Sequence, residues 1–161
     1  ANNRFDIELI QGPAQIQASE VIEASYTSNT GLSLTAGVPA VKVYEDIVTD
    51  THGAYNTSTG VYTCPAPGFY EISAGGGTGT TTFAINDEFA IIFRKNSTTL
   101  YHDGHFNTYA GSTVIMVRAT HVISCNAGDT LDVQHMSDKT TTGSTQATRS
   151  YLHIRRLGGV V

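Results

Sequence analysis

Two short clusters place histidine beside aspartate: His102-Asp-Gly-His105 and Asp50-Thr-His52. Imidazole and carboxylate groups are common metal ligands, so both clusters are candidates for binding a divalent cation. Neither spacing matches the helical His-Glu-x-x-His motif or a zinc-finger pattern, and the sequence has no dedicated acidic calcium loop. The sequence therefore favours polar loop and turn residues at both places, and we predict no metal site.

Serine, histidine and aspartate, the residues of a nucleophilic triad, all occur in the chain, but no Gly-x-Ser-x-Gly elbow is present. The run Gly75-Gly-Gly-Thr-Gly79 lacks the Lys-Ser/Thr that completes a phosphate-binding loop. It is better explained as a strand end where backbones approach closely, or as a loose loop. His121 lies on the apolar face of a predicted strand, which favours a core histidine with an internal hydrogen bond. We therefore expect no enzymatic activity and no cofactor.

The two cysteines, Cys64 and Cys125, each precede a predicted turn. The strands before them would end on the same side of the fold, so the two residues could lie near each other. Two cysteines are too few for a disulfide scaffold, and the N-terminus has no signal-peptide hydrophobic region. We therefore favour two buried free thiols over a disulfide.

The composition limits the partners. Only 14% of the residues are charged, the net charge is −5, and the sequence pI is near 5.6. Phosphate contacts need clustered basic residues, and Arg155-Arg156 is the only tight basic pair, so nucleic acid is not expected as a partner. No apolar run is long enough to span a membrane, so no membrane partner is expected either.

The spacing of apolar residues predicts an all-β fold. Apolar side chains recur at every second position around residues 89–94, 113–125, 131–134 and 151–155, as half-buried strands require. The breaks between these runs contain Gly, Pro, Asn, Ser and Thr, which are typical turn residues. Short strands at this spacing indicate one sandwich or jelly-roll domain over residues 20–161, preceded by a leader over residues 1–19.

Three stretches of the chain resemble the C1q domain family. Residues 60–70 (Gly-Val-Tyr-Thr-Cys-Pro-Ala-Pro-Gly-Phe-Tyr) are similar to its central signature. Residues 122–133 resemble a strand–turn–strand with a Gly-Asp corner, and residues 150–157 resemble the last strand. The resemblance covers about residues 20–157, and these signature and core positions carry it: Tyr44, Asp50, Tyr55, Tyr62, Gly68, Tyr70, Ile72, Gly128 and Asp129.

The chain also departs from that family's pattern. Tyr stands at positions 44 and 62 where Phe is usual, and Ile72 and Ala74 replace aromatic residues. These replacements keep the apolar character that a core position needs. No collagen-like Gly-X-Y stalk is present in the sequence.

The resemblance implies a C1q/TNF-like jelly roll of about ten antiparallel strands, assembled as a homotrimer. Strand alternation would then point Tyr62, Tyr70 and Ile72 into the sandwich. The opposite face of that strand is the candidate trimer interface. At Phe69 the alternative is an ordinary surface aromatic residue. The candidate interface residues are Phe69, Glu71, Ser73, Tyr151, His153 and Arg155.

The leader contains apolar residues in partial alternation with acidic ones: Phe5, Ile7, Leu9 and Ile10. Such a segment can add as a strand to another protein, which makes it a candidate anchoring arm, or it can complete the base of a trimer. A small C1q-like head with a short leader resembles bacteriophage virion proteins. We therefore expect a virion protein that decorates or cements a capsid, with the major capsid protein or another virion protein as partner. The alternative is a receptor- or glycan-binding tip of a phage fibre or a bacterial surface adhesin.

Overall fold

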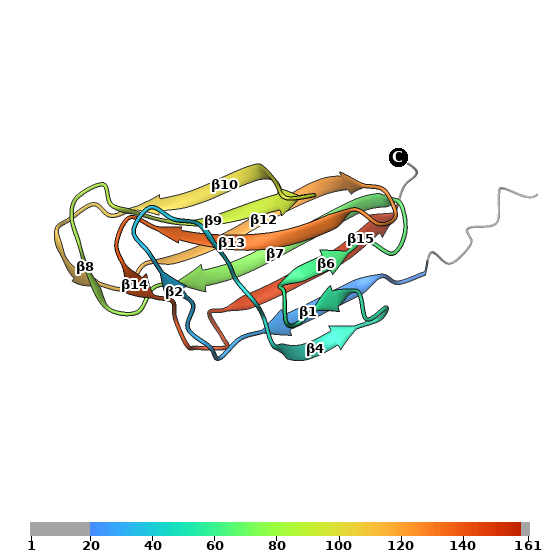
Figure 1. Cartoon of the computed structure of the whole chain (residues 1–161), viewed down its shortest axis with the longest axis horizontal. Coiled ribbons are helices and arrows are strands. Elements are labelled where there is room, and N and C mark those ends of the chain that lie inside the picture. The colour runs from blue at the N-terminus through green and yellow to red at the C-terminus, as the bar shows by residue number, and fades with distance from the viewer. Residues whose placement is uncertain (1–19, 159–161) are drawn as a thin grey trace, which may run out of the picture.

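The computed structural model of the chain describes residues 20–158, which form fifteen β-strands and no helix (Figure 1). None of these residues therefore belongs to a helix that could cross a membrane. The strands are β1 (Glu23–Thr27), β2 (Ser33–Leu34), β3 (Ala40–Val41), β4 (Asp46–Asp50), β5 (Tyr55–Asn56), β6 (Val61–Thr63), β7 (Gly68–Gly77), β8 (Thr81–Phe83), β9 (Glu88–Lys95), β10 (Thr98–Phe106), β11 (Gly111–Thr113), β12 (Met116–Cys125), β13 (Thr130–Ser137), β14 (Thr141–Thr142) and β15 (Tyr151–Gly158).

Two antiparallel sheets face each other. The five-stranded sheet has the order β12-β7-β15-β1-β4, and the six-stranded sheet has the order β10-β9-β13-β6-β5, with β3 paired to β13. Two small pairs, β11 with β8 and β14 with β2, lie outside these sheets. β1 and β15 come from opposite ends of the chain and pair directly, as Glu23 opposite Arg155 shows. The predicted all-β jelly-roll sandwich is confirmed.

The core lies between the two sheets and follows the alternation seen in the sequence. Tyr70 and Ile72 of β7 and Tyr62 of β6 are buried, as predicted. The rings of Tyr62 and Tyr70 meet edge to face across the sandwich, with their centroids 6.1 Å apart. Aromatic residues at these positions bury large apolar areas, which is the main source of stability in a sheet-on-sheet core.

A corner built from residues 64–68 leads from the six-stranded to the five-stranded sheet. Gly68 has a φ of +151°, and a Cβ placed there would lie 2.7 Å from Arg156 Nε. Arg156 Nε instead donates to the carbonyl oxygen of Pro67 at 2.9 Å. The corner therefore favours glycine at position 68 because of its positive φ, and a side chain there would also displace the Arg156 guanidinium.

The glycine run at the end of β7 is a place of close approach, which confirms the first of the two interpretations above. A Cβ at Gly75 would overlap the ring of Tyr151 on the outside of the sheet, and a Cβ at Gly76 would overlap the ring of His135 in the interior. The run therefore lets one aromatic ring pack against each face of β7.

One strand differs from its predicted pattern. The alternation in residues 89–94 predicted a strand buried on one face, but β9 is buried on both. Ala90 and Ile92 point away from the core and are still only 0% and 4% exposed. The candidate anchoring residues Phe5, Ile7, Leu9 and Ile10 lie outside the described residues, so their role stays a prediction.

Candidate functional site

The six predicted interface residues lie together on the outward face of the five-stranded sheet. Phe69, Glu71 and Ser73 are on β7, and the other three are on β15, where Tyr151 pairs with Gly75, His153 with Ser73, and Arg155 with Glu71. We call this surface, formed by the outward side chains of β12, β7, β15 and β1, the open face. The structure thus brings these residues together, while their role in self-association stays a prediction.

Ion pairs and hydrogen bonds cross the middle of the open face. Arg155 Nε lies 2.8 Å from Glu71 Oε1, and His153 Nε2 lies 3.0 Å from Glu23 Oε1. On the other side, the hydroxyl groups of Ser73 and Thr120 form a hydrogen bond. Charged side chains therefore lie side by side on β7, β15 and β1, and the hydrogen bond to Thr120 extends this polar band onto β12.

An aromatic residue and a cation lie beyond this band, toward the glycine-rich end of β7. The ring of Tyr151 lies over Gly75, and the guanidinium carbon of Arg118 is 5.9 Å from its centroid. Arg118 and Glu23 were not among the candidate residues predicted from the sequence. Their alternation within β12 and β1 was visible, but the strand register that places them beside β7 and β15 was not.

Exposed apolar side chains line the other end of the open face. Phe69 is 42% exposed, Val122 47% and Leu157 50%. Gly158 pairs with Phe69, and Val122 pairs with Glu71, so the three side chains occupy neighbouring positions. Val21, just before β1, is also exposed and adjoins Leu157, because the backbone pairing continues from Arg156 N–H to the Ile22 carbonyl oxygen. These four residues form an apolar row.

Asp50, which the sequence offered as a candidate metal ligand, accepts hydrogen bonds that stabilise the fold. Its carboxylate accepts hydrogen bonds from the Tyr26 hydroxyl at 2.7 Å and from the backbone N–H groups of Tyr55 and His52, each at 3.1 Å. Burial alone would raise the pKa of Asp50, but these hydrogen bonds bring it below its ordinary value. Among residues 20–158, no group of three or more His, Cys, Asp or Glu side chains is placed to hold a metal ion.

The other histidine candidates form separate pairs on the two sides of β10. His102 Nε2 lies 3.0 Å from Glu88 Oε1. His121 is on the inward face of β12, as predicted, but it lies at the sheet edge and is only half-buried. Its Nε2 is 2.6 Å from Asp103 Oδ2, and its ring stacks on Tyr101 with centroids 3.7 Å apart. Together these contacts bridge the β12 and β10 edges of the two sheets.

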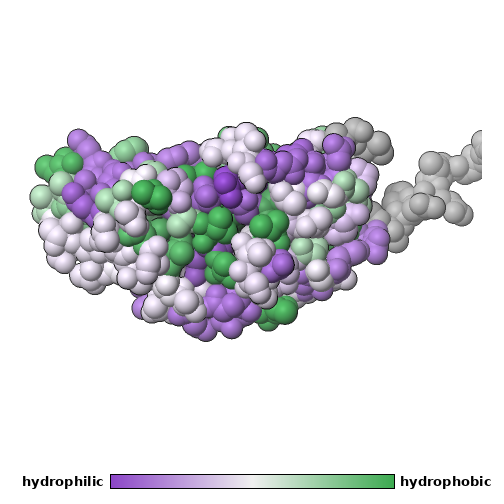
Figure 2. All heavy atoms as spheres, in the orientation of Figure 1, coloured by the Kyte–Doolittle hydropathy of each residue, from purple (hydrophilic) through white to green (hydrophobic). Residues whose placement is uncertain are grey.

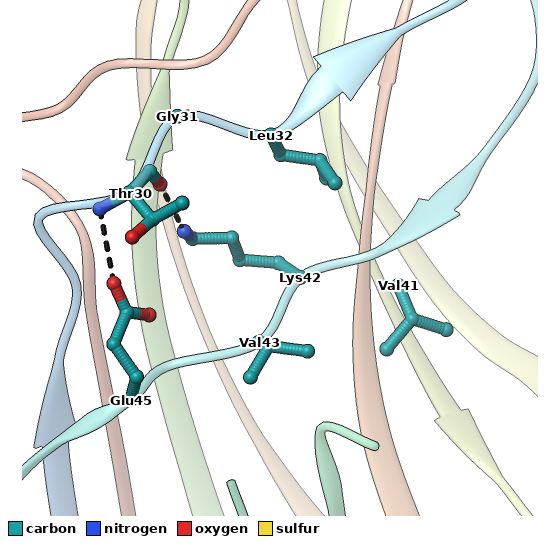
Figure 3. A pocket seen from close by; sticks show the side chains of 7 residues that line it. All are labelled: Thr30, Gly31, Leu32, Val41, Lys42, Val43 and Glu45. Atoms are coloured by element: carbon teal, nitrogen blue, oxygen red, sulfur yellow. Dashed lines mark hydrogen bonds between the residues drawn. The ribbon is translucent and has the colours of Figure 1, made fainter. Parts of the chain in front are cut away.

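A pocket of about 270 Å³ opens between segments 30–32 and 41–45 (Figure 3). Lys42 runs along it with only 4% exposure, and its ammonium donates to Ser28 Oγ at 2.5 Å and to the Thr30 carbonyl oxygen at 2.7 Å. Burial lowers the pKa of Lys42, and nearby Glu45 opposes that shift. Since Glu45 also accepts from the Thr30 N–H at 3.0 Å, the polar groups of the pocket bind its own loop.

The remaining walls of the pocket are Leu32, Val41 and Val43. Figure 2 shows hydrophobic residues near the middle of the face it displays, bordered by residues of intermediate to hydrophilic character. Nothing in the local sequence distinguishes Lys42 from a surface lysine, so its burial could not be predicted from the sequence.

Comparisons with known proteins identify the fold of the chain. No family model matches the chain, and no curated protein matches it. Among solved structures, the Eiger TNF of S. frugiperda matches with a TM-score of 0.67 and 13% identity, covering 88% of this chain and 95% of that one. Murine APRIL matches with a TM-score of 0.64 and 10% identity, covering 86% of this chain and 100% of that one.

The globular domain of the zebrafish complement 1qA protein also matches, with a TM-score of 0.57 and 15% identity. The match covers 83% of this chain and 94% of that one. At these identities the likeness shows the fold alone. The chain therefore has a C1q/TNF-like jelly-roll fold.

Proposed function

We propose that the chain is a non-catalytic module that assembles as a homotrimer through the open face. The observation that carries this proposal is the apolar row of Val21, Phe69, Val122 and Leu157 beside a band of paired charges. Exposed apolar residues that adjoin one another commonly mark a protein–protein contact. An apolar centre with polar groups around it is also the usual composition of such an interface.

The charges of the open face suit contact with a different surface of a second copy. Glu71 and Arg155 form an ion pair within one chain, so their opposite charges offset each other on the open face. A threefold ring needs a heterologous contact, in which two different surfaces of the chain meet. The edge formed by β10 and β12, where Tyr101 stacks on His121, is the surface we expect to pack on a neighbour's open face.

Light scattering coupled to size exclusion tests the assembly. A trimer of the 17.1 kDa chain has three times that mass, about 51 kDa. We expect Phe69→Arg to give a folded monomer, because it places a charge in the apolar row. The matched control is Ile85→Arg, because Ile85 is 60% exposed on the loop between β8 and β9, outside both proposed contact surfaces, and this substitution should leave the trimer intact. A wild-type monomer at micromolar concentration would contradict the proposal.

Within this proposal, the biological role we favour is a bacteriophage capsid decoration or cement protein. The leader would anchor the trimer to the major capsid protein or another virion protein. The pairing of β1 with β15 supports this arrangement, because residues 20 and 158 lie at the same end of the sandwich (Figure 1). Residue 20, at which the leader joins the jelly roll, therefore lies at the end of the sandwich opposite β8 (Figure 1). Cosedimentation of the purified protein with empty phage capsids tests the role, and failure to bind any capsid would contradict it.

A second candidate function rests on the end of the sandwich opposite the termini. Four apolar side chains are exposed there: Ile85, Phe106, Tyr109 and Val114. The loops that carry them are joined by a hydrogen bond of 2.8 Å from Asn86 N–H to the Asn107 carbonyl oxygen. Exposed aromatic residues on loops suit recognition of a glycan or a receptor, as at the tip of a phage fibre or a bacterial adhesin. Loss of host-cell binding in Tyr109→Ala, with capsid binding absent, would favour this function over decoration.

A further inference from the structure

The only two cysteines of the chain meet across the sandwich. Cys64 directly follows β6 of the six-stranded sheet, and Cys125 is the last residue of β12 in the five-stranded sheet. Each is 1% exposed and belongs to the same core. The fold thus brings together two cysteines that lie 61 positions apart in the sequence (125 minus 64).

Backbone hydrogen bonds fix this meeting. The turn over residues 126–129 begins immediately after Cys125 and folds back onto Cys64. Cys64 N–H donates to the Asp129 carbonyl oxygen at 2.8 Å, and Gly128 N–H donates to the Cys64 carbonyl oxygen at 2.9 Å. The positions of both cysteines are therefore set by the same turn.

The electrostatic surroundings of the two thiols differ. The neighbouring Cys125 thiol and burial both raise the pKa of Cys64, whereas the neighbouring Cys64 thiol lowers the pKa of Cys125. The ammonium of Lys95 donates to the Ser124 carbonyl oxygen at 2.8 Å and lies 2.8 Å from Asp129 Oδ2. Its positive charge near Cys125 further favours the thiolate there, and the thiolate is the reactive form of cysteine.

We propose that Cys64 and Cys125 are an oxidation site that closes into a disulfide between the two sheets when the protein meets a peroxide. In the first step the Cys125 thiolate attacks hydrogen peroxide, the O–O bond breaks, and sulfenic acid and water form with uptake of one proton. In the second step Cys64 sulfur attacks the sulfenic sulfur, the S–O bond breaks, and a second water leaves with the thiol proton. Two thiols are oxidised by two electrons and one peroxide is reduced to two waters.

The cross-link would fix the end of the molecule that carries the apolar row. Cys125 pairs with Gly68, which directly precedes Phe69, so the bond would lie behind that part of the open face. It would also close a loop of 62 residues, from 64 to 125, and long loops lose much unfolded-state entropy on cross-linking. The inference does not depend on the proposed assembly, because both sulfurs belong to one chain.

The test uses the full chain, reduced and then exposed to hydrogen peroxide. We expect the intact mass to fall by about 2 Da, the loss of two hydrogens. Non-reducing peptide mapping should show the Cys64 peptide joined to the Cys125 peptide. The melting temperature should rise by about 10 °C and return after treatment with dithiothreitol.

Two sets of variants complete the experiment. Cys64→Ala and Cys125→Ala should each show no melting shift on oxidation, and Cys64→Ala should stop at a sulfenic acid on Cys125. Lys95→Gln should slow cross-linking several-fold without changing the product, a result that a purely structural role of Lys95 would not give. Oxidation of wild-type protein to sulfinic acid, or to disulfides between chains, with no internal cross-link would overturn the proposal.

Discussion

The two sheets differ in what covers their outward faces. On the six-stranded sheet, the outward residues Ala90 and Ile92 are as buried as the core, and Glu88 and Asp132 beside them are also buried. On the five-stranded sheet, the apolar residues Phe69, Val122 and Leu157 stay exposed. Both faces contain apolar side chains, yet only one of them is covered within a single chain.

Side chains of the same sheet provide that cover. The carboxylate of Glu88 occupies the space that a Cβ of Gly104 would need, and His102 lies 3.0 Å from it across Ala90. Arg94 donates two hydrogen bonds to Asp132, at 2.8 and 3.0 Å. The apolar residues Ala90 and Ile92 are thus covered within one chain, whereas the apolar row of the open face stays exposed, as the proposed self-association requires.

The largest effect is expected where the two sheets are joined, at Gly68. We predict that Gly68→Val prevents folding, because a β-branched residue is strained at a φ of +151° and its Cβ would press on Arg156. Yield of soluble assembly is the measurement. Gly111→Val is the matched control, since the nearest atom to its Cβ is at 3.5 Å. A native-like Gly68→Val protein would show that the corner does not depend on glycine.

A matched pair of substitutions tests the two faces directly. Asp132→Asn leaves Arg94 without its carboxylate on the covered face, and we expect it to lower the free energy of unfolding by about 2 kcal/mol while the assembly keeps its mass. Glu71→Gln removes the partner of Arg155 on the open face, where an exposed pair contributes less than about 1 kcal/mol to the fold. We expect Glu71→Gln to weaken self-association instead. Urea unfolding and light scattering separate the two outcomes, and dissociation by Asp132→Asn alone would reverse the assignment.

Acidification should act on the core beneath both faces. His135 is fully buried, and burial, with a smaller contribution from nearby Lys42, lowers its pKa from 6.5 to about 3. Unfolding lets this histidine bind a proton, so the stability is complete above pH 6.5 and is lost as the pH falls toward 3. We expect about 2 to 3 kcal/mol less unfolding free energy at pH 4.5 than at pH 7.

The control for this effect is His135→Leu, which cannot titrate. Between pH 6.5 and pH 5 its stability should change less than that of the wild type. Asp50 and Asp129, whose pKa values lie below their ordinary range, contribute mainly at lower pH. An unchanged slope in the variant over that interval would show that another group governs the acid response.

The sequence predicted the sheet elements better than their surroundings. Alternation identified which side of β7 carries Tyr70 and Ile72, and a local pattern was sufficient because a strand alternates with a fixed period. It could not show that β9 is covered on both faces, because that depends on Gly104 making room for Glu88 in a neighbouring strand. The same reason explains why Lys42 was missed. Its burial comes from Ser28 and Thr30, which the fold brings to it.

The smallest effect on folding is expected from the leader. Phe5, Ile7 and Leu9 alternate with Asp6 and Glu8, so the segment suits strand addition to another protein. We predict that deleting residues 1–12 leaves the melting temperature and the trimer mass unchanged but abolishes binding to empty capsids. A second variant, with Ile7 and Leu9 both changed to Ser at full length, should also lose binding and controls for the shortened chain. If the truncated protein no longer trimerises, the leader completes the base of the assembly, and if it still binds capsids, the anchor lies on the jelly roll itself.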